Sequence, residues 1–189
     1  MANCPDARLH LQHSTWRDDR VRAAFTERAG AHSIAAERLV FTNKLSYPEA
    51  LAEFNAIDIM LDTTPFSGSS ITAEALWMGV PVVTLPNQDF SSRTSASLLT
   101  AIGKADWIAN DRKHYIDVAS SLASDIVQLE ILRPQLCERM RGSSVGTAEI
   151  SHMSCNNNCK RCGRRGRRGL RLNGNECANS DTASTLTRV

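Results

Sequence analysis

Short apolar runs alternate with longer amphipathic segments along the first 145 residues of the chain. Runs rich in Val, Ile, Leu and Phe predict β-strands, whereas apolar residues spaced three or four apart predict helices. Gly79 and Gly103 each end a helical pattern, which is typical stop chemistry. The pattern predicts strands at 8–12, 38–42, 57–61 and 82–85, with a weaker strand at 107–108, and helices near 17–31, 48–54, 68–78, 92–102, 111–122 and 126–140.

Strands separated by helices of this length indicate βαβ units, whose strands run parallel and are covered on both faces. Because crossovers between parallel strands are right-handed, the units form a doubly wound layer. The expected fold class is therefore α/β, with a Rossmann-like parallel sheet of about five strands.

Composition narrows the class of protein only a little. The 189 residues are 42% hydrophobic and 22% charged, which suits one globular domain and excludes collagen or wholesale disorder. No apolar run is long enough to cross a membrane, and the N-terminus does not resemble a secretory signal. Because the spacing of the six cysteines suggests no disulfide framework, we expect a cytoplasmic location.

Charge divides the chain into two parts. Residues 1–145 hold 14 Lys/Arg against 17 Asp/Glu, whereas residues 146–189 hold 8 against 3. The second part is rich in Cys and Arg and lacks hydrophobic periodicity, so we expect a basic, disordered tail behind a mildly acidic domain.

The richest candidate site is the segment 62–72, which joins a predicted strand to the helix that carries Glu74. Gly68 would let the backbone approach a ligand, and the N–H groups of Ser69, Ser70 and Ile71 would bind phosphate at the helix start. Hydroxyls of Ser69, Ser70 and Thr72 would add donors, and Glu74 would accept from sugar hydroxyls. An ordinary Ser-capped helix explains the same residues. Neither the Gly-Lys-Ser/Thr phosphate loop nor the Gly-x-Gly-x-x-Gly turn is present, which disfavours nucleotide triphosphate hydrolysis.

Residues 57–85, and above all Glu-Ala-Leu-Trp-Met-Gly-Val-Pro at 74–81, resemble the C-terminal catalytic region of the O-GlcNAc transferase (SPINDLY-like) family. Similar blocks follow at 92–99 and 106–140, so the resemblance covers roughly residues 7 to 145. It implies the donor-binding part of a GT-B glycosyltransferase, which transfers N-acetylglucosamine from UDP-GlcNAc to Ser or Thr of an acceptor protein. It also implies that neither a cofactor nor a metal is needed.

The resemblance also assigns roles to residues. Gly68, Ser69, Ser70, Ile71 and Thr72 match the diphosphate loop of the donor site, and Glu74 matches its ribose-binding acid. Arg93 is either a cation near the cleft or part of a surface ion pair. No catalytic residue is assigned within this chain.

The chain departs from the family pattern at several positions. Ile71 stands where a threonine is usual, and Ala50 and Glu53 replace the histidine and basic residues expected near the uracil. The first predicted strand corresponds to the second strand of the donor domain, so the remaining catalytic domain and the tetratricopeptide repeats would be partners outside this sequence. We therefore expect the chain alone to be inactive, and a non-catalytic truncated or frameshifted product is an open alternative.

The tail suggests two other activities. Cys155, Cys159 and Cys162, with His152 or Cys177, could hold zinc, although few apolar residues surround them. The run 164–171 is rich in Arg and would bind nucleic acid without sequence preference, because no aromatic residue is interleaved to stack on bases. A nucleic-acid-binding protein is thus the alternative from a different class.

Overall fold

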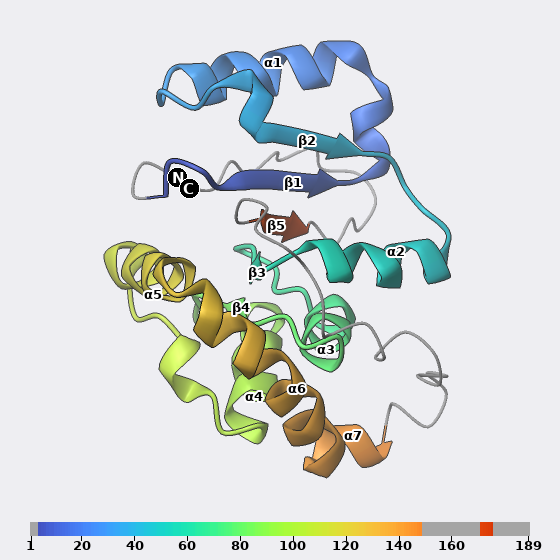
Figure 1. Ribbon diagram of the computed structural model, residues 1–189, viewed down its shortest axis with the longest axis vertical. Helices are drawn as coiled ribbons and strands as arrows, with labels where there is room; N and C mark the ends of the chain where they lie inside the picture. Colours follow the sequence, from blue (N-terminus) through green and yellow to red (C-terminus); the bar gives the residue numbers. More distant parts are fainter. Residues whose placement is uncertain (1–3, 149–170, 176–189) are drawn as a thin grey trace.

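The computed structural model describes residues 4–148 and the strand at residues 171–175 (Figure 1). A five-stranded sheet with the order β2-β1-β5-β3-β4 runs through the molecule, and its paired strands are parallel. This confirms the α/β class with a Rossmann-like parallel sheet. The strands are β1 (Arg8–Gln12), β2 (Leu39–Thr42), β3 (Ile59–Leu61), β4 (Val82–Val83) and β5 (Arg171–Asn175).

Seven α-helices in the described residues connect and cover these strands. Figure 1 places α1 beside β2 at one end of the molecule and α4, α6 and α7 at the other. The helices lie close to the predicted segments, because the apolar spacing and the stop residues that mark them are local. Their bounds are α1 (Asp19–Gly30), α2 (Tyr47–Glu53), α3 (Ser70–Trp77), α4 (Thr94–Ala101), α5 (Arg112–Ser124), α6 (Ile126–Gly142) and α7 (Ser144–Ala148).

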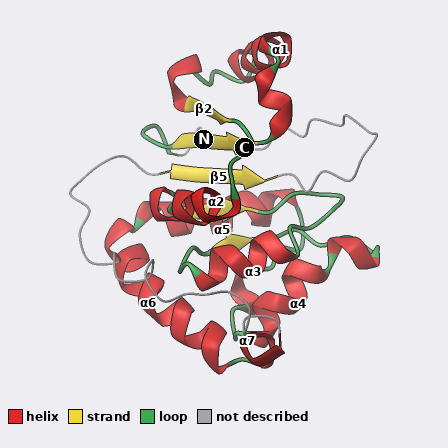
Figure 2. Ribbon diagram, turned by 90° about the vertical axis from the view of Figure 1, so that its right-hand side faces the viewer, coloured by secondary structure: helices red, strands yellow, loops and turns green. Residues whose placement is uncertain are grey.

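Alternate residues of the central strands enter two separate hydrophobic clusters. Ile59, Leu61 and Val83 belong to the first cluster, which also holds apolar residues of β1, α1 and α5. Met60 and Val82 belong to the second, together with residues of α3, α4 and α6. Successive side chains of a strand point to opposite faces, so β3 and β4 are covered on both sides. Figure 2 shows the helices on both sides of the strands.

Gly79 explains why α3 ends where it does. Its φ of +76° is a conformation that L-residues with a side chain rarely adopt. A Cβ at this position would lie 2.6 Å from the carbonyl oxygen of Arg133 on α6. The glycine therefore serves both the turn into β4 and the close packing of α6 on α3.

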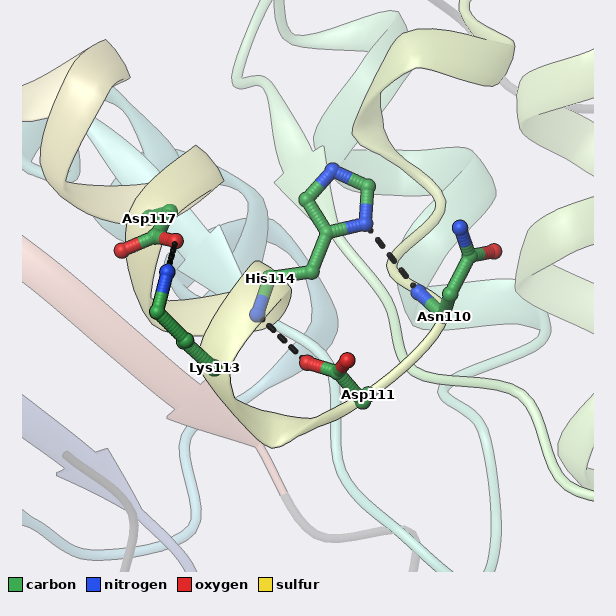
Figure 3. Close-up of polar contacts among 5 residues, drawn as sticks. All are labelled: Asn110, Asp111, Lys113, His114 and Asp117. Carbon is green, nitrogen blue, oxygen red and sulfur yellow. Dashed lines mark hydrogen bonds and ion pairs between the residues drawn. The ribbon is translucent and has the colours of Figure 1, made fainter.

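Polar residues at the start of α5 form a helix cap (Figure 3). An Oδ1 atom of Asp111 accepts a hydrogen bond from the backbone N–H of His114 at 2.7 Å, and His114 Nδ1 accepts from Asn110 N–H at 3.2 Å. Lys113 and Asp117 form an exposed ion pair one turn further on. Asp111 thus satisfies one free backbone donor of the first turn, that of His114, which is a structural role.

Three features differ from the sequence predictions. The segment 107–108 forms only an isolated bridge, in which Ile108 pairs with Thr84, so it adds no strand to the sheet. Helix α7 crosses the expected domain boundary at 145/146. Residues 171–175, expected to be disordered, form β5 in the middle of the sheet, where β1 and β3 pair with it on both sides.

The tail residues with candidate chemistry lie outside the described part of the chain. They are the Cys/His set at 152–177 and most of the arginine run at 164–171. Within the described residues, no helix combines the length and apolar character needed to cross a membrane.

Candidate functional site

The loop that follows β3 lies at the carboxyl edge of the sheet, where doubly wound folds bind their ligands. It runs from Asp62 to Ser69 and leads directly into α3. Ser67 bonds to the Ser91 carbonyl through both its backbone N–H (3.1 Å) and its hydroxyl (2.9 Å). These bonds hold the loop against the segment that precedes α4.

The buried residue Asp62 holds this loop in place through hydrogen bonds. The residue is 1% exposed, and its carboxylate accepts hydrogen bonds from Gly68 N–H at 2.7 Å and from the Thr84 hydroxyl at 2.6 Å. The Tyr115 hydroxyl donates to the Asp62 carbonyl at 2.9 Å. Burial raises the pKa of the Asp62 carboxyl, and the hydrogen bonds from Thr84 and Gly68 oppose that rise.

Sequence reasoning missed Asp62 as a functional-site residue. The available signal was a carboxylate placed directly after a continuous apolar strand, where burial without partners is costly. Such a group needs donors, and only the folded chain shows that Gly68 and Thr84 supply them.

Side-chain atoms of nearby residues leave no room for a side chain at Gly68. A Cβ there would come within 2.8 Å of Thr72 Oγ1, 3.2 Å of Met60 Cε and 3.3 Å of Asp62 Oδ1. We predicted that this glycine lets the backbone approach a ligand. The structure adds a second reason for it, because the protein itself fills the space next to Gly68.

The residues that the resemblance matches to a diphosphate loop separate into an exposed and a buried set. Ser69 and Ser70 are exposed at the start of α3, with Ser69 at a φ of +40°. Ile71 is half-buried against the second cluster, and its N–H donates to the Gly68 carbonyl at 2.8 Å. Thr72 is fully buried, with its hydroxyl 2.8 Å from that of Ser95. The predicted donation to phosphate by Ile71 N–H and Thr72 Oγ1 would require these internal bonds to be exchanged.

Glu74 lies half-buried one turn into α3, and its carboxylate accepts a hydrogen bond from the Tyr47 hydroxyl. Burial raises the pKa of Glu74, which the bond from Tyr47 opposes. Burial of the phenol and the negative charge of Glu74 raise the pKa of Tyr47. Tyr47 is 53% exposed and begins α2, so a residue that the sequence analysis did not single out lies beside the expected ribose-binding acid.

Arg93 precedes α4, two residues after Ser91, whose carbonyl accepts the hydrogen bond from the Ser67 hydroxyl in the loop after β3. Its side chain is exposed and lines a shallow depression with Pro86 and residues of α4. The two ion pairs formed among the described residues involve other side chains than Arg93. No group of His, Cys, Asp and Glu in the described residues could hold a metal ion.

A doubly wound parallel sheet with a small-residue loop and a helix start at its carboxyl edge is the arrangement of the Rossmann-like class of α/β domains, many of which bind nucleotides at that edge. Glycosyl transferase family 41 matches residues 5–151, and the chain belongs to this family. The resemblance found in the sequence is thereby confirmed.

Individual relatives support the same assignment. The chain is 34% identical over 148 residues to a probable UDP-N-acetylglucosamine--peptide N-acetylglucosaminyltransferase SPINDLY of Hordeum vulgare, covering 77% of this chain and 16% of the relative. The Arabidopsis thaliana protein of that name is 32% identical, covering 75% and 16%. A solved mutant of the Thermobaculum terrenum O-GlcNAc transferase superposes with a TM-score of 0.69 at 35% identity, covering 75% of this chain and 27% of that chain. The chain thus spans about a sixth of the length of these plant relatives.

Proposed function

We propose that this chain is the donor-binding part of a protein O-GlcNAc transferase, an enzyme that transfers N-acetylglucosamine from UDP-GlcNAc to Ser or Thr of an acceptor protein. The observation that carries the proposal is the match of residues 5–151 to Glycosyl transferase family 41, together with the loop at the carboxyl edge of the sheet. Relatives named as peptide N-acetylglucosaminyltransferases support the donor and the acceptor class.

In this proposal the exposed start of α3 binds the donor diphosphate. Ser69 and Ser70 are exposed and offer hydroxyl and amide donors, and the positive end of the helix dipole favours the anion. Glu74 accepts hydrogen bonds from the ribose, and Arg93 adds positive charge to the cleft. Gly68 shapes the loop, and Ile71 and Thr72 anchor the helix start in the protein.

The remaining expectations come from the family resemblance. They are metal-free donor binding, a cytoplasmic location, and cooperation with an acceptor-side domain and tetratricopeptide repeats elsewhere in the enzyme. The chain alone is then inactive, because this segment supplies donor contacts and no catalytic residue. Nucleic-acid binding gains no support, since the arginine run lies mostly outside the described residues.

A nuclear magnetic resonance titration of the isotope-labelled chain with UDP tests the proposal. The few contacts available should give a dissociation constant no tighter than about millimolar. We expect the amide shifts to concentrate at Gly68–Glu74 and at Tyr47, and Glu74→Ala to weaken the binding. Inorganic phosphate serves as the control for non-specific anion binding. Shifts scattered over the surface, or equal shifts with phosphate alone, would reject the assignment of this loop.

A further inference from the structure

Ser69 has an unusual backbone conformation at the start of α3. Among the described residues, Ser33 and Ser69 are the two that combine a positive φ with a side chain. Ser33 follows the end of α1, where the Ile34 N–H donates to the Ala29 carbonyl at 3.0 Å, and a positive φ is common after a helix. Ser69 precedes a helix, where the capping residue is normally extended, yet its φ is +40° and its ψ is −105°. The helix start therefore does not account for this conformation.

The side chain of Ser69 does not cap α3 either. At the start of α5 the Asp111 carboxylate accepts from the His114 N–H, and at α6 Asp125 accepts from the Gln128 N–H at 2.9 Å. The side chain of Ser69 makes no such bond to the described first turn of α3, and the residue is exposed. A helix leaves its first N–H groups without intrahelical partners. The start of α3 thus keeps donors of the kind that α5 and α6 satisfy with their own caps.

Hydrogen bonds on both sides of Ser69 hold it in place. On the loop side, the Gly68 N–H donates to Asp62 Oδ1 at 2.7 Å, and on the helix side the Ser69 carbonyl accepts from the Ala73 N–H at 3.1 Å. Asp62 is 1% exposed, and the Thr84 hydroxyl donates to its Oδ2 atom at 2.6 Å. Because the bond from Ala73 belongs to the helix, the buried carboxylate is the tether that the helix does not supply.

A strained backbone such as that of Ser69 persists only where its surroundings over-determine it, and such residues gather at ligand sites. We propose that Asp62 is a positioning residue for the donor diphosphate: through Gly68 it holds Ser69 at its positive φ, and this conformation directs the N–H groups of Ser69 and Ser70 toward the anion. The inference rests on the proposed function, which supplies the diphosphate. Asp62 acts without touching the donor, since both of its carboxylate oxygens accept hydrogen bonds inside the protein.

The directions of the backbone N–H groups decide how well such a loop binds an anion. Successive N–H groups that converge on one point form a concave anion-binding nest. Rotation about the N–Cα bond of Ser69 changes the angle between its own N–H and that of Ser70. A loop that is already held in the binding conformation loses less conformational entropy when the ligand binds. The Asp62 tether therefore raises donor affinity without adding a contact to the donor.

Replacing Asp62 in the isotope-labelled full chain separates this positioning role from a contribution to stability alone. Asp62→Ala removes the acceptor of the Gly68 N–H, so we expect Ser69 to relax to a negative φ and the dissociation constant for UDP to rise at least about fivefold. Asp62→Asn keeps a carbonyl oxygen for Gly68 and should retain both the positive φ and the affinity to within about twofold. Nuclear magnetic resonance couplings of Ser69 report φ, and titration with UDP reports affinity.

Leu136→Ala is the matched control, because truncating this fully buried leucine of α6 also destabilises the fold but lies outside the hydrogen-bond network of the loop. It should leave the affinity for UDP unchanged. If Asp62→Ala does not fold, Thr84 decides the question. Thr84→Val removes the hydroxyl that holds Asp62 Oδ2 and should weaken UDP binding at least about twofold, whereas Thr84→Ser should not.

Several results would overturn the inference. They are a folded Asp62→Ala chain that keeps either the positive φ or the UDP affinity, an Asp62→Asn chain that loses as much affinity as the alanine variant, an equal loss in Leu136→Ala, and unchanged binding in Thr84→Val. Failure of the proposed function looks different. If UDP shifts no amide at the start of α3 in the unaltered chain, the donor assignment is wrong, while the φ of Ser69 in the Asp62 variants still decides whether the carboxylate holds it.

Discussion

Two carboxylates of the candidate site stand in contrasting surroundings. Asp62 lies in the floor of the loop, fully buried, with donors from Gly68 and Thr84. Glu74 lies on the rim, half-buried, with the partly exposed Tyr47 as its partner. The comparison teaches that a buried group whose hydrogen bonds are satisfied within the protein shapes the site, whereas a group with open lone pairs can bind a ligand.

The largest effect on stability should come from removing the buried carboxylate of Asp62. We expect Asp62→Ala to lower the free energy of unfolding by about 3 kcal/mol, because two buried donors lose their acceptor. Urea unfolding followed by circular dichroism measures the change. Asp89→Ala, at an exposed position, is the matched control and should change stability by less than about 0.5 kcal/mol. Equal effects of the two substitutions would show that the buried hydrogen bonds of Asp62 do not stabilise the fold.

Gly68→Ala tests how tightly the floor is packed. The added Cβ would meet Thr72 Oγ1 at 2.8 Å, so we expect a loss of about 1–3 kcal/mol in the free energy of unfolding. Gly30→Ala is the control, since a Cβ at the end of α1 meets no atom within 4 Å. Alanine there should be neutral or stabilise by up to about 1 kcal/mol. A thermal melt of both variants separates the two results.

Glu74→Ala tests the rim and should spare the fold. In a family 41 enzyme that carries this segment, we expect the KM for the donor to rise about tenfold or more, because a charge-assisted hydrogen bond contributes about 1.5–3 kcal/mol. Steady-state kinetics measures KM, and a melting curve of the same protein checks stability. An unchanged KM with an intact fold would leave the start of α3 as an ordinary capped helix.

Ile71→Thr should give the smallest effect. Threonine restores the hydroxyl that the family pattern has at this position, but Ile71 packs against the second cluster. We therefore expect a loss of about 1 kcal/mol in stability from the removed apolar surface, with little change in donor KM. If KM falls clearly and stability is retained, the side chain turns toward the donor and Ile71 belongs to the rim.

Much of the site could be located from the sequence because its signals are local. The end of an apolar strand, Gly68, two serines and the helix start all lie within one short segment. The motif at 74–81 identified the family. The role of Asp62 could not be found this way, because Thr84 and Tyr115, which bond to it, are distant in sequence. Tyr47 was missed for the same reason, since its contact with Glu74 joins two separate helices.

The sequence by itself determined the α/β class, the approximate positions of α1 to α6 and the family, because hydrophobic spacing, stop residues and a specific motif act over a few neighbouring positions. Only the tertiary structure decided the strand order and which hydroxyls near the loop are internal. Residues 171–175 show the reason most clearly. Their composition opposes a central strand, yet the edges of β1 and β3 leave backbone groups that need partners, and such a requirement exists only after distant strands have come together.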